Sequence, residues 1–226
     1  QDLKARPGKP GLKVGARNTF REYVSVHLGT QEGEWTVLGD DNVLLAYSHI
    51  AHDCVIGNHC ILVNNASIAG HVHVGDWAIL GGYSLVHQYC HMGEHSFSGM
   101  QTAIGKDVPA YVMAYGTPAK ARSINSEGLR RRGFSEEAIM ALRRAYKIVY
   151  RQGLTVEMAL AALADMADEF PEVATLRDSI KASSRGIRRA RKRRSWQMVF
   201  PHIGEALAST HSERKASIWA SACAVS

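Results

Sequence analysis

The residues of this sequence that are best suited to chemistry are its histidines. Nine of the eleven histidines lie between residues 27 and 95. His52, His71 and His87 recur there at similar intervals, and Asp53 follows His52 directly. Imidazole takes up or releases a proton near neutral pH, and its neutral form ligates metal ions. A fold that brought these side chains to one edge would therefore create either a general-base site or a metal site.

A six-residue repeat supplies such a fold. Every sixth residue from Leu38 to Ile104 is apolar except Ser98, and the next residue is Gly or Ala in nine of the twelve repeats. Six residues turn an α-helix by about 600°, which is not a whole number of turns, and an ordinary strand alternates with period two. A short strand followed by a turn fits the period, and the small residue is expected to ease each corner. Three such sides, one hexapeptide each, complete a coil, and stacked coils form a parallel β-helix.

Stacking of these coils brings the candidate site together. Because a coil is three hexapeptides long, Gly70 and Gln88 lie over His52, and His71 and His87 are each immediate neighbours of that column. Neighbouring coils are about 4.8 Å apart, so we expect their side chains to converge on one edge. Either several imidazoles gather a metal ion there, or one acts as a general base while the others hold substrate. The phase extends back to Val14, interrupted by residues 29–36 as a loop.

The repeat stops after Pro109, and residues 127–183 have helical patterns. Ser135 is a predicted cap of a helix that ends at Gln152-Gly153, Thr155 caps a second through Asp168, and Pro171 begins a third that runs to about Lys181. The sequence thus predicts a mainly β protein with a β-helix over residues 1–122, a C-terminal α-helical domain over residues 123–186 and a basic tail of unknown structure over residues 187–226.

Composition narrows the class of protein. The chain has 226 residues, 46% hydrophobic and 21% charged, which is typical of a globular protein. Its net charge of +6 arises in residues 184–226, with nine Lys or Arg against two Asp or Glu. No aromatic platform accompanies that segment, so specific nucleic-acid binding is not expected. No apolar run is long enough for an integral membrane segment, and no signal sequence is recognisable. Four cysteines without a CxxC pair favour reduced thiols and a cytoplasmic protein.

Several motifs together resemble one family. They are QDLK (1–4), HIAHDC (49–54), NNASIAGH (64–71), VHQYC (86–90) and EGLRRRGFS (127–135), and the likeness runs from residue 1 to about Gly186. The chain resembles the UDP-N-acetylglucosamine 3-O-acyltransferases of lipid A biosynthesis. The resemblance implies a left-handed parallel β-helix, a homotrimer with active sites between subunits, and no metal or organic cofactor. It also implies transfer of an R-3-hydroxyacyl group from acyl carrier protein to the 3-hydroxyl of UDP-N-acetylglucosamine.

The same resemblance implies roles for particular residues. His52 matches the general base, Asp53 the residue that supports it, and Gly70 the residue whose backbone N–H faces the oxyanion. Adjacent side chains of a regular strand point apart, so a contact between His52 and Asp53 requires a turn or a second subunit. Met100 matches the acyl-chain ruler, with a core methionine as the alternative. Substrate-contacting positions are matched by Asp2, Lys4, His49, His71, His87, Gln88, Arg131 and Arg132, the two arginines having a solvated helix face as their alternative.

The sequence also departs from the family and leaves rival functions open. It begins at QDLK, where members of the family carry earlier coils, so we expect an open sheet face. It continues past Gly186 into a basic segment, and it has Met100 where some members have glycine. One rival is a β-helix carbonic anhydrase whose zinc would be held by His52, His87 and His91 across a subunit interface. The other is an inactive trimeric scaffold.

Overall fold

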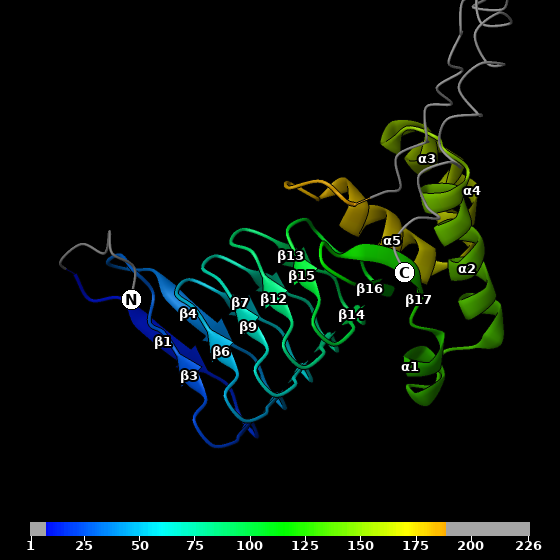
Figure 1. Ribbon diagram of the computed structural model, residues 1–226. Coiled ribbons are helices and arrows are strands. Elements are labelled where there is room, and N and C mark those ends of the chain that lie inside the picture. Colours follow the sequence, from blue (N-terminus) through cyan, green and yellow to red (C-terminus); the bar gives the residue numbers. More distant parts are fainter. Residues whose placement is uncertain (1–7, 189–226) are drawn as a thin grey trace, which may run out of the picture. The chain divides into compact units, whose positions relative to one another are not determined.

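A computed structural model describes residues 8–188 of this chain. These residues form a three-sided column of short strands, and the helices gather at the end of the column opposite β1 (Figure 1). Sheet A contains β1 (Gly11–Val14), β4 (Trp35–Leu38), β7 (Val55–Ile56), β10 (His73–Val74) and β13 (His91–Met92). Sheet B contains β2 (Thr19–Phe20), β5 (Val43–Leu44), β8 (Ile61–Leu62), β11 (Ile79–Leu80), β14 (Phe97–Ser98), β16 (Val112–Tyr115) and β17 (Lys120–Ile124). Sheet C contains β3 (Ser25–Val26), β6 (His49–Ile50), β9 (Ser67–Ile68), β12 (Leu85–Val86) and β15 (Ala103–Ile104).

The strand register confirms the predicted coil. Strands of the middle coils pair in parallel with the strand three hexapeptides later, as His49 does with Ser67 and Ile79 with Phe97. Pairing in the first coil joins Gly11 to Trp35, a step longer by one hexapeptide, because extra residues enter between β3 and β4. The predicted interruption over residues 29–36 therefore ends earlier than expected, since β4 begins at Trp35.

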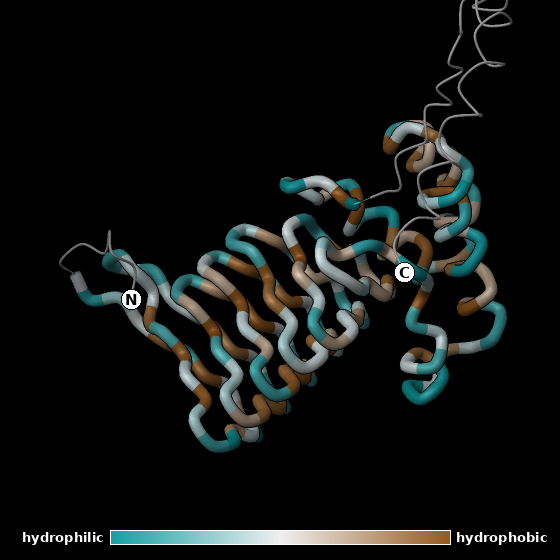
Figure 2. Tube along the Cα trace, viewed as in Figure 1, coloured by the Kyte–Doolittle hydropathy of each residue, from teal (hydrophilic) through white to brown (hydrophobic). Residues whose placement is uncertain are grey.

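The repeating apolar positions fill the interior of the column. All twelve of them, from Leu38 to Ile104, are at most 3% exposed, and hydrophobic segments recur from coil to coil along the column (Figure 2). Ser98 is the polar exception, and its hydroxyl lies 2.8 Å from that of Ser84. In the first coil the corresponding Val14 is 45% exposed. The period of six thus marks the buried positions from the second described coil onward.

The corners are built differently from the sequence prediction. The left-handed conformation falls on non-glycine residues such as Asp41, His59 and Trp77, which have φ near +60° and lie three positions after the buried aliphatic residue. Along sheet A, the small residue directly after the aliphatic one is required for another reason, which is the close approach of the next coil. A Cβ on Gly57 would lie 2.2 Å from Asp76 Oδ1. The next coil approaches so closely that only glycine fits, so the expected easing of the turn is wrong at these positions.

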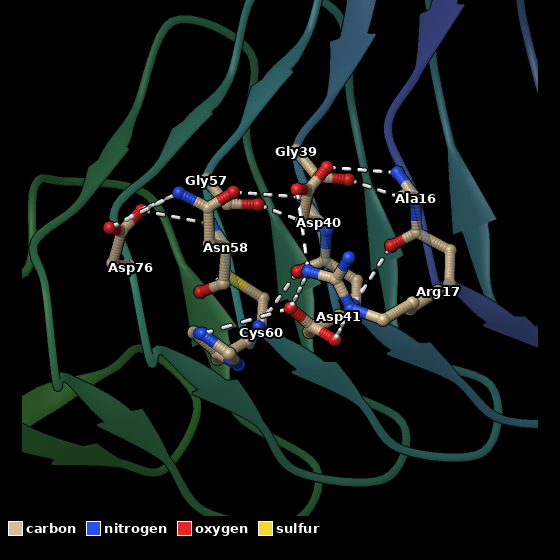
Figure 3. Close-up of polar contacts among 12 residues, drawn as sticks. Ala16, Arg17, Gly39, Asp40, Asp41, Gly57, Asn58, Cys60 and Asp76 are labelled. Carbon is tan, nitrogen blue, oxygen red and sulfur yellow. Dashed lines mark hydrogen bonds and ion pairs between the residues drawn. The ribbon is translucent and has the colours of Figure 1, made fainter.

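A ladder of side-chain hydrogen bonds connects successive coils at the corner between sheets A and B (Figure 3). The backbone N–H of Ala16 donates to Asp40 Oδ1, that of Asp40 to Asn58 Oδ1, and that of Asn58 to Asp76 Oδ1, each at 2.8 Å. Each carboxylate or amide therefore satisfies a backbone donor of the preceding coil. Glycines of the preceding coil leave the space into which these side chains reach back: a Cβ on Gly15, Gly39 or Gly57 would collide with Oδ1 of the side chain that reaches it.

The helical region follows β17, which continues to Ile124 and so crosses the boundary predicted at residue 122. It comprises α1 (Ser126–Arg131), α2 (Glu136–Arg151), α3 (Val156–Ala162), α4 (Ala164–Glu169) and α5 (Pro171–Lys181). Ser135 and Thr155 cap α2 and α3 as predicted, each accepting a hydrogen bond from the backbone N–H of the third residue after it. The predicted second helix is in fact two, because Leu163 forms a turn that leaves its side chain fully buried.

Three cysteines behave as predicted. Cys54, Cys60 and Cys90 are buried free thiols. Burial raises the pKa of Cys54 and Cys60 to about 12 and that of Cys90 to about 11, so all three are protonated at neutral pH. Cys223 lies outside the described residues. Within residues 8–188 no helix is both long enough and apolar enough to cross a bilayer.

Candidate active site

His52 and Asp53 form the centre of the site at the corner between sheets C and A. His52 Nδ1 lies 2.8 Å from Asp53 Oδ2, and the two side chains are 17% and 7% exposed. A carboxylate only accepts hydrogen bonds, so Nδ1 carries the donated proton and Nε2 is left as the basic nitrogen. Asp53 has φ +58°, which turns its side chain back toward the preceding histidine. A turn within the subunit therefore makes the contact that a regular strand would forbid.

Two threonines hold Asp53. The Thr30 hydroxyl donates to Asp53 Oδ2 at 2.8 Å and its backbone N–H donates to Oδ1 at 3.0 Å, while the Asp53 N–H donates to Thr36 Oγ1 at 2.8 Å. Burial acts to raise the pKa of Asp53, but the hydrogen bonds from His52 and Thr30 and the nearby His71 outweigh it and hold the pKa below its usual value. The carboxylate is consequently ionised and fixed in orientation.

Gly70 lies directly over the His52 ring, as the coil length predicts. The His71 N–H donates to the His52 carbonyl at 3.0 Å, and the Tyr89 N–H donates to the Gly70 carbonyl at 3.1 Å, which sets the coils in register. A Cβ on Gly70 would lie 2.4 Å from His52 Cε1. Among the described residues no hydrogen-bond partner occurs for the Gly70 N–H. Glycine here lets the imidazole approach the backbone and leaves a donor available beside it.

His71 completes a compact cluster. Its ring meets that of His52 edge to face at 5.1 Å and stacks on Tyr89 at 4.6 Å, and its Nε2 lies 3.8 Å from Asp53 Oδ2. Nitrogen or oxygen atoms of His52, Asp53 and His71 all lie within 4.8 Å of one another, a spacing that could also hold a metal ion. Imidazole and carboxylate groups are among the usual protein ligands of zinc. This set differs from the three histidines of the carbonic anhydrase alternative.

The other histidines of the predicted edge lie around this cluster. His49 Nδ1 is 2.8 Å from the Ser25 hydroxyl, and burial lowers the pKa of His49, which favours its neutral form. His87 and Gln88 are exposed on the next coil, where His87 Nδ1 lies 3.1 Å from the Gln88 carbonyl oxygen. Within residues 8–188 no hydrogen bond or ring contact joins His87 to the cluster. Of the three histidines predicted to converge, all of them among the described residues, His52 and His71 are in contact, and His87 is not in contact with them.

The two arginines of α1 and its C-terminal end have different surroundings. Arg131 is exposed and pairs with Glu127 at 3.1 Å on the same helix. Arg132 is half-buried against the column, where its guanidinium stacks over the Trp77 ring at 4.9 Å and donates to the Trp77 carbonyl at 3.2 Å. Burial lowers the pKa of the Arg132 guanidinium. One arginine therefore faces solvent, and the other joins the end of α1 to a corner of the solenoid.

Of the remaining predicted residues, the structure describes only Met100. Met100 is 73% exposed, which contradicts its core alternative. Its Cγ lies 3.9 Å from the position of a Cβ on Gly82, as the stacking predicts. Asp2 and Lys4 lie outside the described residues, as does the basic tail beyond residue 188.

Thr30 and Thr36 are site residues that the sequence did not reveal. Residues 29–36 are identifiable only as a break in the repeat, and no motif marks the threonines within it. Their contact with Asp53 depends on how the extra residues fold back over the next coil. The one available signal is that an insertion one hexapeptide long falls at the same corner as the HIAHDC motif.

Comparison with known proteins agrees with this fold. A model of the UDP N-acetylglucosamine O-acyltransferase family, its domain 2, matches residues 107–188, and a model of six bacterial transferase hexapeptide repeats matches residues 36–70. The acyl-[acyl-carrier-protein]--UDP-N-acetylglucosamine O-acyltransferase of Pseudomonas fluorescens strain Pf0-1 is 66% identical over 189 residues, covering 83% of this chain and 73% of the relative.

Solved structures give the same result. LpxA from Acinetobacter baumannii matches with a TM-score of 0.81 and 46% identity, covering 84% of this chain and 74% of that chain. UDP-N-acetylglucosamine O-acyltransferase (LpxA) from Moraxella catarrhalis matches with a TM-score of 0.79 and 43% identity, covering 83% of this chain and 73% of that chain. The parallel solenoid and its repeats define a hexapeptide-repeat transferase with C-terminal helices. Within that class, the chain belongs to the UDP-N-acetylglucosamine O-acyltransferase family, which confirms the resemblance seen in its motifs.

Proposed function

We propose that this chain transfers an R-3-hydroxyacyl group from acyl carrier protein to the 3-hydroxyl of UDP-N-acetylglucosamine, in the first step of lipid A biosynthesis. The observation that carries the proposal is the His52–Asp53 pair, with Nδ1 engaged at 2.8 Å and Nε2 free of hydrogen-bond partners among the described residues. An imidazole oriented by a carboxylate is the arrangement that general-base catalysis of acyl transfer uses. The name of the relative from Pseudomonas fluorescens specifies an acyl-carrier-protein donor and UDP-N-acetylglucosamine as the acceptor of an O-acyl group.

Groups already described at the site can carry out each step of this reaction. His52 Nε2 removes the proton of the sugar 3-hydroxyl as its oxygen attacks the thioester carbonyl. The resulting oxyanion lies beside the Gly70 N–H, which stabilises it. When the carbon–sulfur bond breaks, the imidazolium returns the proton to the departing thiolate of the carrier. Asp53 keeps the productive tautomer throughout and stabilises the transient charge on His52.

Substrate binding belongs to residues around this centre. His49, His71, His87 and Gln88 are proposed to offer hydrogen bonds to the sugar and the acyl donor. Asp2 and Lys4 are proposed contacts of the sugar and the nucleotide. Arg131 and Arg132 are proposed to serve anionic substrate groups; Arg131 is the more accessible of the two. Met100 is proposed to limit acyl-chain length.

A homotrimer is part of the proposal. Leu85 on sheet C is 56% exposed, and Tyr83, Tyr89 and Met100 at its borders are 48–73% exposed. Large apolar side chains gathered on one face indicate a surface that another subunit covers. Light scattering coupled to gel filtration tests the trimer. A cytoplasmic location, expected from the free thiols and the carrier-bound donor, is tested by fractionation of cells.

An acyl-transfer assay tests the proposed function. Purified protein is given R-3-hydroxyacyl carrier protein and UDP-N-acetylglucosamine, and the acylated sugar nucleotide is measured. His52→Ala is expected to lower turnover by about 10²–10⁴-fold without loss of folding. His59→Ala provides the matched control, because His59 stacks on Trp77 at 4.0 Å at a different corner of the solenoid. Normal turnover in a folded His52→Ala variant would contradict the assignment.

The metal-compatible spacing of His52, Asp53 and His71 supports one second candidate, a zinc enzyme that activates water. Metal analysis of the protein purified without chelators separates the two. Stoichiometric zinc, with activity lost on its removal and regained on its return, would favour the second candidate. Full acyl transfer by metal-depleted protein would exclude a metal requirement for the proposed reaction. An absence of acyl transfer by folded protein with every substrate tried would favour the inactive scaffold.

A further inference from the structure

We propose that Thr30, carried by the insertion between β3 and β4, is a positioning residue that orients Asp53 and through it His52. This inference rests on the proposed function, because it gives the insertion a part in the same reaction. The Thr30 side chain is almost completely buried, with the residue 5% exposed. Such burial of a loop threonine beside an ionised carboxylate indicates that its hydroxyl has a specific partner.

Thr30 contacts both carboxylate oxygens of Asp53. Its hydroxyl donates to Oδ2 at 2.8 Å and its backbone N–H donates to Oδ1 at 3.0 Å. Oδ2 also accepts the hydrogen bond from His52 Nδ1 at 2.8 Å. Two donors from one residue, one on each oxygen, fix the plane of the carboxylate. The direction in which Oδ2 meets the imidazole is thereby fixed as well.

The insertion is shaped to deliver this contact. The Gly29 N–H donates to the Gly11 carbonyl at 3.0 Å, and a Cβ on Gly29 would lie 2.5 Å from the Glu34 carbonyl oxygen and 3.0 Å from Asp53 Oδ1. Glycine is therefore required for the loop to close over the carboxylate. Gly33, with φ +81°, supplies the turn that returns the chain to β4. Glu34 Oε2 lies 3.5 Å from the Thr30 hydroxyl, so the shorter contact with Asp53 takes the proton.

Without the Thr30 hydroxyl, the Asp53 side chain loses one of the two donors that share Oδ2. The carboxylate can then rotate, and the population of His52 with its proton on Nδ1 and a free Nε2 falls. Removal of a group that orients a metal-bound histidine typically lowers activity by about 10- to 100-fold, and we expect a loss of the same order for a histidine that acts as a base. Thr30 touches neither substrate nor the reacting atoms in this scheme, so the loss is expected in kcat and not in KM.

The experiment compares Thr30→Val, which replaces the hydroxyl with a methyl group, with Thr30→Ser, which keeps it. Thr30→Val is expected to lower kcat by about 10- to 100-fold with KM nearly unchanged, and Thr30→Ser to restore most of the rate. Thr102→Val is the control: Thr102 is 1% exposed, and its hydroxyl donates to the Gly99 carbonyl at 2.8 Å, away from the His52–Asp53 pair. If Thr30→Val does not fold, Thr30→Ala, which leaves space instead of a methyl group, replaces it with the same expected result.

Nitrogen NMR of the protein with labelled histidine gives a readout that a merely structural role would not move. The wild type and Thr30→Ser are expected to show His52 protonated at Nδ1, and Thr30→Val a mixture of tautomers. Wild-type kcat and tautomer in folded Thr30→Val would overturn the proposal, as would an equal loss of kcat in Thr102→Val. His52→Ala is assayed alongside: if it keeps full turnover, the proposed function fails, while the tautomer of Thr30→Val still decides whether Thr30 orients the pair.

Discussion

Replacement of Gly70 by alanine tests the geometry of the site most directly, because one methyl group would enter the space of the His52 ring. The new Cβ would lie 2.4 Å from Cε1 and 2.6 Å from Nε2 of His52, whereas ordinary contact begins at 3.4 Å. The ring or the backbone must therefore shift by about 1 Å, and a misplacement of that size can cost about 100-fold in rate. We expect kcat of Gly70→Ala to fall by about that factor.

The protein is expected to remain folded. The colliding atoms belong to a side chain that can rotate, and Gly70 does not have the left-handed φ that alanine would resist. Loss of the His52–Asp53 hydrogen bond, which involves a charged group, would lower the free energy of unfolding by about 1.5–3 kcal/mol. Thermal melting and gel filtration verify that the variant is folded and assembled before steady-state kinetics are measured.

Gly105→Ala is the matched control for this change. A Cβ on Gly105 would meet nothing within 4 Å in the described chain, so both stability and kcat are expected to stay close to those of the wild type. A folded Gly70→Ala variant with the kcat of the wild type would refute the reasoning. An equal loss in Gly105→Ala would assign the effect to alanine substitution in general and not to the His52 ring.

Three further predictions concern other parts of the molecule. Arg132→Ala should lower the free energy of unfolding, measured by urea denaturation, by about 1–3 kcal/mol, because it removes the stacking and the hydrogen bond on Trp77. Arg131→Ala should leave stability nearly unchanged but raise KM for the UDP-sugar, and added salt should have the same effect on the wild type. The pKa of Asp53 is held below its usual 3.8, so its ionised form stabilises the fold above that pH and the contribution is lost as the pH falls below it. Urea denaturation at pH values above and below this pKa should therefore show that acidification destabilises Asp53→Asn less than the wild type. Parallel plots of the free energy of unfolding against pH for the two proteins would contradict this. Met100→Gly should shift donor preference from about ten carbons toward fourteen, since room for four more methylenes is worth about 3 kcal/mol, and an unchanged donor profile would remove the ruler role.

Much of the fold could be predicted because its signals are local and repeated. The period of six places an aliphatic residue inside the column on every side, and the observed pairing of Ile61 with Ile79 is the step of three hexapeptides that it predicts. Caps at Ser135 and Thr155 mark the starts of helices for the same reason, since the capping group and the N–H it satisfies lie within one turn of the chain. The turn at Leu163 carries no such signal, because Leu163 is part of the hydrophobic core and burial depends on the tertiary structure.

The glycines show where local reasoning fails. From the sequence, Gly57 is expected to adopt a backbone conformation that eases the turn, yet the left-handed positions are occupied by residues such as His59 and Trp77. What requires glycine is the Asp76 carboxylate of the next coil, 2.2 Å from the place of a Cβ. A steric requirement imposed by a residue a full coil away cannot be seen in a single turn of sequence.

The sequence by itself determined the coil length, and with it the column in which His52, Gly70 and Gln88 stack, because a fixed period adds up to a fixed geometry. It also determined the family, through motifs such as HIAHDC and the comparisons that agree with them. Only the tertiary structure decided that Asp53 reaches His52 within one subunit, because a left-handed turn reverses its side chain. Only the tertiary structure placed Thr30 on that carboxylate, since an insertion without a repeat has no periodicity, and its position depends on the coil over which it folds.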